Sequence, residues 1–423
     1  MPNNRQHFVA IVGGAIAGSV AAETLADHGI RVAVIEQNKR PYGKVEDGLP
    51  RWHAEQRKQE YARIDARLKK PGVTFVPSTK LGRDLDFQCC CNEWGFSAVI
   101  LANGAWRDRE LAIPGAEQFV DKGLVYQNPF IYWYNHKNEK DYSGPRYATP
   151  DETLVLGGGL ASIDVVKVLQ LENYERAIRA RGLETDLHEL ERKGIPAVCK
   201  RLGIQPEDLG IKGCLLIYRR REQDMPLTQP PENATPEQIA KTESVRQKML
   251  RLAREKYLFR FQERRMPVGL VVEDGQLRGL KLAETRVEGR RAEPIPGSEH
   301  ELRAPLVISS IGSVPEAIPG VVMKGEYYAF TDEAMAQYSG SDHVFGVGNV
   351  VTGQGNIRAS LLHSQEVTAR LIKAVEERVE ALPALSESQV AALEQRIRAQ
   401  QERVGYTGDY DSWIAKVTPP DLE

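Results

Sequence analysis

The sequence predicts an α/β fold in which one domain is inserted into another, followed by a helical tail. Residues 8–18 and 153–162 predict this fold, because each stretch is an apolar run of strand length that ends in a glycine cluster and continues as a helical pattern. The strand at 98–101 is expected to return to the first sheet, and the strand at 306–312 to lead back from the second domain. Together these patterns are typical of two nested Rossmann-like units.

The composition fits a globular chain of two or three domains. Of the 423 residues, 41% are hydrophobic and 27% are charged, and the net charge is −2. This balance predicts no general attraction to nucleic acid or to an anionic membrane. No apolar run reaches the roughly 18 residues of a membrane span, and the polar residues 1–7 do not resemble a signal peptide. We therefore expect a cytoplasmic protein, and the oligomeric state stays open.

The five cysteines are Cys89, Cys90, Cys91, Cys199 and Cys214. They make no C-x-x-C pair and no ferredoxin-type run, so we expect neither a zinc site nor an iron–sulfur cluster. The C-x4-C pair of disulfide-reducing flavoproteins is also missing from the first domain. Three adjacent cysteines in an extended chain alternate in direction and cannot face one ligand, which favours buried or reduced thiols.

The first glycine cluster has the form of a dinucleotide-binding loop. Gly13, Ala15 and Gly18 occupy the positions of G-x-G-x-x-G, and a second apolar strand at 32–35 ends in Glu36. Glu36 follows Gly18 by 18 residues, close to the roughly 20 expected for an acid that holds ribose hydroxyls. A plain structural turn is the alternative interpretation. Ala15 departs from the motif, since its methyl group stands where the backbone approaches the phosphates.

The rest of the first domain is expected at 1–115 and 306–375. Residues 40–53 have loop composition, 54–70 predict a charged helix, and 73–76 predict a short strand. The strand at 98–101 stops at Asn103-Gly104. Near the end of this domain, a strand and turn at 343–349 lead to a helix from about 358 to 377.

The second glycine cluster opens a domain expected at 116–305. Gly157, Gly159 and Ser162 form an intact G-x-G-x-x-S, and the matching second strand arrives only at 214–218. We expect the charged, helical residues 171–213 between them to be an insertion, which is either a partner-docking element or a solvent-exposed helical segment.

The aromatic stretch 130–135 is either a packed connector or part of a site.

The second strand of this domain ends in Arg219, Arg220 and Arg221 instead of an acid. An NAD site favours a carboxylate at this position, whereas an NADP site favours guanidinium groups for the 2′-phosphate. A solvated charge run is the alternative. The position directly after the strand favours phosphate binding.

The C-terminal part is expected to be mostly helical. A helix at 243–256 and a small sheet around Asp274-Gly275 complete the second domain. Residues 376–423 predict a helical extension. Within it, Ser386 and Gln389 resemble a capping box for a helix that ends near 403, and the aromatic tail at 406–413 packs on its own chain or on a partner.

Four motifs resemble a known family. Residues 41–48 with His53, residues 130–135 and residues 157–164 are similar to stretches of adrenodoxin-reductase-type ferredoxin–NADP reductases. Residues 218–221 with Met225-Pro226 resemble the related glutamate synthase small subunit. The resemblance spans about 8–371. The iron–sulfur domain of the glutamate synthase subunit has no counterpart here, so the simpler reductase is the better comparison.

The resemblance implies an FAD site in the first domain and an NADPH site in the second. The implied FAD contacts are Gly13, Gly14, Ala15, Ala17, Gly18, Glu36, Gln37, Gly43, Lys44, Val45, Gly48, Ala102, Asn103, Gly104, Gly348, Asn349, Gly355, Asn356 and Ile357. The implied NADP contacts are Gly157, Gly159, Leu160, Ala161, Ser162, Arg219 and Arg220. His53 is the one matched ionisable group near the expected isoalloxazine, or else a structural histidine. The chain departs from the family at Ala15, Glu46 and Asn349.

Two dinucleotide sites in one chain imply hydride transfer between a nicotinamide and a flavin. We expect an FAD-dependent NAD(P)H oxidoreductase that passes electrons to a ferredoxin-like protein or a partner subunit. One alternative is a non-catalytic or assembly subunit of a larger redox complex, which the altered residues would suit. Another is a flavin-dependent monooxygenase, although the linking motif of that family is missing.

Overall fold

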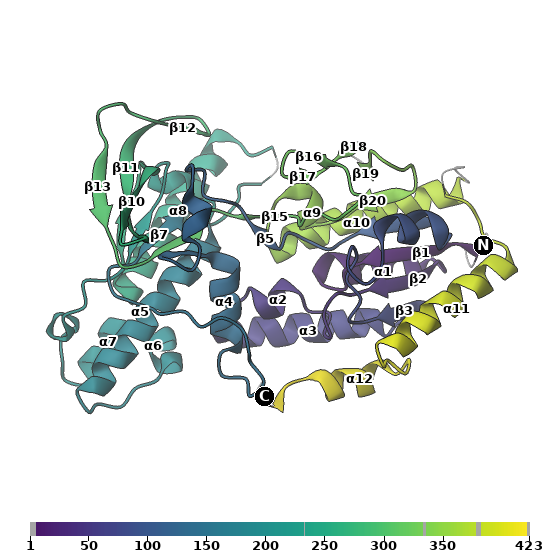
Figure 1. Ribbon diagram of the computed structural model, residues 1–423, viewed down its shortest axis with the longest axis horizontal. Coiled ribbons are helices and arrows are strands. Elements are labelled where there is room, and N and C mark those ends of the chain that lie inside the picture. The colour runs from purple at the N-terminus through teal and green to yellow at the C-terminus, as the bar shows by residue number, and fades with distance from the viewer. Residues whose placement is uncertain (1–5, 232, 333–335, 378–381, 421–423) are drawn as a thin grey trace. The chain divides into compact units, whose positions relative to one another are not determined.

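The computed structural model describes residues 6–231, 233–332, 336–377 and 382–420 (Figure 1). The chain folds into two compact units. The first contains residues 1–107, 138–141 and 313–423, and the second contains 108–137 and 142–312. The second is therefore inserted into the first, and the α/β class expected from the sequence is confirmed. Within the described residues, no helix combines the length and apolar character needed to cross a membrane.

The first unit is built on a seven-stranded sheet of order β18-β19-β20-β4-β1-β2-β3, in which β20 to β3 run parallel. Its strands are β1 (Phe8–Val12), β2 (Arg31–Ile35), β3 (Val73–Val76), β4 (Ala98–Leu101), β18 (Phe330–Asp332), β19 (Gln337–Tyr338) and β20 (Val344–Gly346). A separate short pair is β16 (Met323–Lys324) with β17 (Tyr327–Tyr328). The strand at 98–101 does return to the first sheet, as predicted.

Helices complete the first unit. They are α1 (Ile16–Asp27), α2 (Lys44–Asp47), α3 (Ala54–Leu68), α9 (Asn349–Thr352), α10 (Ile357–Glu376), α11 (Glu387–Arg403) and α12 (Tyr410–Val417), with short turns at Arg51–His53 and Cys89–Glu93. Helix α1 packs against α10 and α3. Every residue of β1 is buried, which is typical of a parallel strand covered on both faces.

The C-terminal segment belongs to the core of the first unit. Leu393 and Ile397 of α11 are buried with side chains of β1, β2 and β4, and Trp413 of α12 is buried with side chains of α1 and α3. The predicted capping box is present, since the Ser386 hydroxyl accepts from the Gln389 N–H and the Gln389 side chain accepts from the Ser386 N–H. The aromatic tail packs on its own chain.

The second unit has a parallel sheet of order β6-β14-β7-β8-β9 and an antiparallel sheet of β10 to β13. The strands are β6 (Leu124–Tyr126), β7 (Leu154–Gly157), β8 (Leu215–Ile217), β9 (Arg260–Gln262), β10 (Arg265–Glu273), β11 (Gln276–Glu288), β12 (Arg291–Pro294), β13 (His300–Arg303) and β14 (Val307–Ser310). The helices are α4 (Gln127–His136), α5 (Leu160–Ala180), α6 (Leu187–Lys193), α7 (Ile195–Arg201) and α8 (Pro236–Tyr257), with short turns at Ala116–Phe119, Pro206–Leu209 and Glu222–Asp224. The chain passes between the units within β5 (Arg107–Asp108), on either side of residues 138–141, and just before β15 (Ser313–Val314).

Three expectations need correction. Strand β14 pairs in parallel with β6 and β7, so 306–312 completes the second sheet before the chain leaves it. Helix α5 continues to Ala180 because its apolar residues remain buried, so the stretch expected as an insertion starts within this helix. Cys89–Glu93 form a π-helical turn instead of an extended chain. Four of the cysteines are buried, Cys89 is half-buried, and none forms a disulfide.

Candidate functional site

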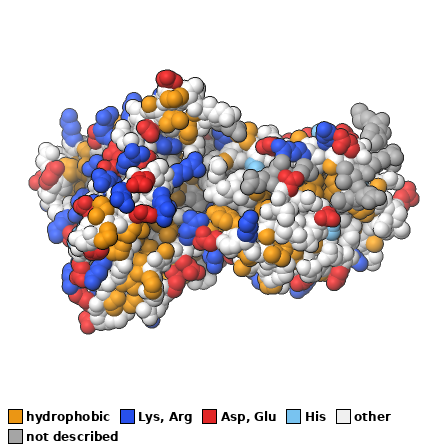
Figure 2. All heavy atoms as spheres, turned by 90° about the horizontal axis from the view of Figure 1, so that it is seen from above, with side chains coloured by type: hydrophobic (Ala, Val, Ile, Leu, Met, Phe, Trp, Pro, Cys, Tyr) orange, Lys and Arg blue, Asp and Glu red, His pale blue; other side chains and the backbone are white. Residues whose placement is uncertain are grey.

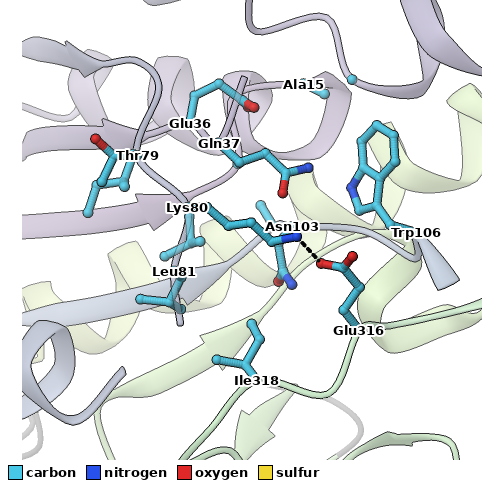
Figure 3. A pocket seen from close by; sticks show the side chains of 15 residues that line it. Ala15, Glu36, Gln37, Thr79, Lys80, Leu81, Asn103, Trp106, Glu316 and Ile318 are labelled. Atoms are coloured by element: carbon cyan, nitrogen blue, oxygen red, sulfur yellow. Dashed lines mark ion pairs between the residues drawn. The ribbon is translucent and has the colours of Figure 1, made fainter. Parts of the chain in front are cut away.

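A cavity of about 500 Å³, counting the space open to solvent, lies at the carboxyl ends of β1, β2 and β4 (Figure 3). This is the edge where ligands bind in open parallel sheets. Seven of the residues expected at the FAD site line the cavity: Gly13, Ala15, Glu36, Gln37, Gly43, Ala102 and Asn103. All belong to the first unit.

The glycine loop after β1 is tightly packed. Gly13 has a φ of +105°, and a Cβ there would lie 2.6 Å from the Ala102 carbonyl oxygen. A Cβ on Gly18 would lie 1.8 Å from the Gly13 carbonyl oxygen. Both positions therefore require glycine, which brings the start of α1 close to the end of β1. Gly14, Ala17 and Gly18 support this turn but do not line the cavity.

Glu36 is the buried acid of the site, with 3% of its surface exposed. Its Oε2 accepts from the Gly14 N–H at 2.7 Å, and its Oε1 accepts from the Asn38 N–H at 2.8 Å. Burial is the largest influence on the carboxyl group and raises its pKa to about 7, against these two hydrogen bonds, which lower it. The glycine loop and the acid after β2 are thus joined directly at the cavity.

Ala15 is the residue that precedes α1, and its side chain makes no capping hydrogen bond. Its methyl group faces Gly43, where a Cβ would lie only 2.9 Å from the Ala15 Cβ. Gly43 has a φ of +50°. The methyl group of Ala15 is therefore accommodated by the absence of a side chain on the opposite loop.

The loop that contains Gly43 leads into α2 and a short turn. Lys44 donates to the Ser313 hydroxyl at 3.1 Å and lies over the Trp106 ring. Glu46, which departs from the family pattern, forms a buried ion pair with Arg40. Lys44, Val45, Gly48 and His53 do not line the cavity.

Eight lining residues were not predicted as site residues. They are Val12, Ile35, Thr79, Lys80, Leu81, Trp106, Glu316 and Ile318. Lys80 and Glu316 form an ion pair of 2.7 Å across the pocket, as Figure 3 shows. Residues 79–81 follow β3, and the rule that ligands bind beyond the carboxyl ends of parallel strands could have indicated them. No local pattern marks Glu316 or Ile318, which come from a distant part of the chain.

The expected contacts near the C-terminus lie on a second loop. Gly348 precedes α9, and a Cβ there would lie 2.6 Å from the Ala17 Cβ, so this turn is packed on the start of α1. The Gly348 N–H donates to Nδ1 of His363 at 3.0 Å. The side chain of Asn356 caps α10 by accepting from the Ala359 N–H. Gly104, Gly348, Asn349, Gly355, Asn356 and Ile357 do not line the cavity.

Two amides of these loops have an unpaired oxygen. Among the described residues, Oδ1 of Asn103 and Oδ1 of Asn349 are buried without a hydrogen-bond partner. Such groups are rare in folded proteins because a buried acceptor without a partner is costly. Their presence, with the close glycine turns, fits a polar ligand that meets both loops.

The glycine loop of the second unit has free space beside it, whereas the glycine loop of the first unit is tightly packed. Gly159 precedes α5, and apart from its two chain neighbours no described residue has a heavy atom within 4 Å of the position a Cβ would take there. Leu160 beside it is half-exposed. Ser162 is buried and its hydroxyl donates to the Gly159 carbonyl oxygen. With Gly157 and Ala161, these residues form a bare helix N-terminus of the kind that binds phosphate.

The three arginines after β8 differ in their surroundings. Arg219 is exposed. Arg220 donates from Nε to the Tyr218 hydroxyl and from Nη2 to the Asp224 carbonyl oxygen. Arg221 forms a two-point ion pair with the Asp224 carboxylate. Arg219 is therefore the best placed of the three to meet a ligand phosphate.

Fold and site define a protein of two nested Rossmann-like units, each with a glycine loop at the end of a sheet strand. Residues 7–182 match the family model described as pyridine nucleotide-disulphide oxidoreductase. The resemblance expected from the motifs is confirmed by relatives of both kinds. The chain is 30% identical over 181 residues to mitochondrial NADPH:adrenodoxin oxidoreductase of Arabidopsis thaliana, covering 41% of this chain and 35% of that protein.

It is also 24% identical over 374 residues to the glutamate synthase [NADPH] small chain of Halomonas elongata, covering 85% of this chain and 66% of that protein. The chain thus spans less than two thirds of the length of these relatives. Among solved structures, Mycobacterium tuberculosis FprA in complex with NADPH superposes with a TM-score of 0.69 at 20% identity, covering 94% of this chain and 91% of that one. That likeness supports the fold.

Proposed function

We propose that this protein is an FAD-dependent NAD(P)H oxidoreductase that passes electrons to a ferredoxin-like protein or a partner subunit. The observation that carries the proposal is the pair of glycine loops with different partners. The first is hydrogen-bonded to a buried acid, Glu36, at a cavity. The second is followed by an exposed arginine, Arg219. An acid suits the ribose of FAD, and an arginine suits the 2′-phosphate of NADPH.

In this proposal, bound FAD would supply the chemistry that carries electrons from NADPH to the partner. The chain binds and orients the two dinucleotides. Glu36 would hold the adenosine ribose, the N-terminus of α1 would bind the pyrophosphate, and the amide oxygens of Asn103 and Asn349 would accept hydrogen bonds from the rest of the cofactor. At the second loop, the N-terminus of α5 would hold the NADPH pyrophosphate. His53 stays a prediction, and no proton transfer is assigned to it.

The partner that receives the electrons is proposed to be a protein. The names of two relatives mention adrenodoxin and a larger synthase, which supports a protein partner. Figure 2 shows basic and acidic side chains interspersed over the described part of one face, which does not favour one charge of partner. The cytoplasmic location also stays a prediction.

An anaerobic titration tests the proposal. The purified protein is expected to release one FAD per chain on denaturation. Added NADPH is expected to bleach the flavin absorbance stoichiometrically, and NADH to do so less effectively. The Glu36→Ala variant lacks the proposed ribose acceptor and should be isolated with less flavin.

Three other results of these measurements would contradict the proposal or favour an alternative function. A colourless protein that takes up no added FAD would contradict the proposal. Bound FAD that neither nucleotide reduces would favour the alternative of a non-catalytic subunit. Fast NADPH-dependent oxygen uptake linked to a hydroxylated product would favour a monooxygenase.

A further inference from the structure

The C-terminal helix α11 covers the edge of the first sheet. Strand β3 is the last strand on that side, so its outward carbonyl groups have no neighbouring strand. The side chain of Gln401 donates from Nε2 to one of them, the Phe75 carbonyl oxygen, at 2.7 Å. Figure 1 shows α11 running beside β3. The helix therefore satisfies a backbone group that would otherwise be unpaired and buried.

The neighbouring residue, Gln400, reaches the loop that lines the cavity. Its Nε2 donates to the Thr79 hydroxyl at 2.9 Å, and the exposed fractions of the two residues are 9% and 1%. The same hydroxyl donates to the Pro77 carbonyl oxygen, and the Thr79 N–H donates to the Glu36 carbonyl oxygen at 2.8 Å. A continuous chain of hydrogen bonds thus runs from α11 to the backbone of the acid at the cavity.

Helix α12 holds the loop on the other side of Glu36. Trp413 donates from its indole N–H to the Lys39 carbonyl oxygen at 2.8 Å. The hydroxyl groups of Tyr410 and Tyr42 both donate to the Asp65 carboxylate, at 2.7 and 3.1 Å. Lys39 and Tyr42 lie between Gln37 and Gly43, which both line the cavity.

These contacts share a feature that packing alone does not require. A helix that only covered an apolar surface would bury apolar side chains. Helices α11 and α12 also bury amide, indole and phenol donors. Burying such a donor is costly unless it has a hydrogen-bond partner. Thr79 and Lys39 are the partners of two of these donors, and both lie in loops that shape the cavity.

We propose that α11 and α12 position the cavity loops for the adenosine end of FAD, with Gln400 and Trp413 as positioning residues. This inference rests on the proposed function, because it takes FAD to be the ligand. It goes further in assigning a role in cofactor affinity to the C-terminal segment, which none of the sequence motifs indicated.

The test measures FAD affinity and apoprotein stability separately. Gln400→Met removes the donor to Thr79 at nearly constant volume, and Trp413→Phe removes the donor to Lys39 but keeps an aromatic ring. Gln395→Met is the matched control, since Gln395 is exposed on the same helix. The Kd for FAD is measured by fluorescence titration of flavin-free protein, and the Tm of each flavin-free variant is recorded alongside.

Each of the two variants is expected to raise the Kd for FAD about five- to tenfold. The reason is that the free energy of about one hydrogen bond, which holds each loop in its binding conformation in the parent, must then come from FAD binding. Gln395→Met should bind like the parent protein. If Gln400→Met and Trp413→Phe lower the apoprotein Tm but bind FAD within twofold of the parent, the helices are structural only and the inference is overturned while the proposed function stands. A parent protein that binds no FAD would overturn both.

Discussion

Ala15 and Gly43 show how single residues shape the cavity. Both line it, and the methyl group of the first occupies the space that a side chain on the second would need. The departure of Ala15 from the glycine motif is therefore compensated by a glycine 28 positions later in the sequence. The compensation depends on a loop conformation with φ of +50° at Gly43, which no local pattern predicts.

This contact predicts a specific coupling. Gly43→Ala should destabilise the protein by about 1–3 kcal/mol, because it combines a left-handed backbone with a clash. Ala15→Gly alone should be nearly neutral, since glycine is accepted at the residue before a helix. The double variant should recover part of the loss. Urea unfolding of all four proteins measures the coupling, and strictly additive effects would show that the two residues do not meet.

Glu36 makes stability depend on pH. Its folded pKa of about 7 lies above the ordinary 4.5, so the folded flavin-free protein holds a proton that the unfolded chain loses. The stabilisation is fully present below pH 4.5 and is lost as the pH rises to about 7, by at most about 3 kcal/mol. Glu36→Gln should show a flatter dependence between these values. Parallel slopes in the parent and the variant, measured by urea unfolding without flavin, would contradict this assignment.

At the scale of elements, the structure at the end of β8 gives different surroundings to three arginines that look equivalent in the sequence. Arg221 and Arg220 are both held by Asp224, the first by its carboxylate and the second by its backbone carbonyl oxygen, whereas Arg219 is exposed. The short turn at Glu222–Asp224 causes this difference, because it brings Asp224 back toward the strand end. Only the local fold distinguishes a residue available to a ligand from residues that stabilise a turn.

Arg219→Ala should therefore raise the KM for NADPH about 10- to 100-fold, as expected for loss of a charge-assisted contact to phosphate. The KM for NADH should change little, because NADH lacks the 2′-phosphate. Arg221→Ala is the control and should affect stability more than nucleotide preference. Steady-state kinetics with both nucleotides measures the effect. An equal increase for NADPH and NADH would remove the proposed role of Arg219.

At the scale of the whole molecule, the two units have separate cores and separate parallel sheets. The first unit is completed only when residues 313–423 return to it, because β20 pairs with β4 and α10 packs on α1. The return begins after β14, which stays with the second sheet by pairing with β6 and β7. The pairing of β14 therefore sets the boundary between the two units, and no pattern in the sequence predicts this pairing.

The sequence by itself determined the features that depend on neighbouring residues. Gly13, Gly18 and Glu36 were predictable because a strand, a turn and a helix of set lengths bring them together within one βαβ unit. The glycine loop at 157–162 was predictable for the same reason. Burial of an apolar run and the need for glycine at a close turn are local effects, so they leave a local pattern.

Only the tertiary structure decided which distant segments complete the cavity. Glu316 forms an ion pair with Lys80 across the cavity, and Gln400 donates a hydrogen bond to Thr79. The residues of each pair are far apart in the sequence, so a periodic pattern of residues cannot predict either contact. The membership of β14 and the packing of α11 on β3 were decided likewise by pairing between remote strands and helices. Such contacts depend on the summed burial and hydrogen bonding of the whole fold, and this is the physical reason that the sequence pattern does not contain them.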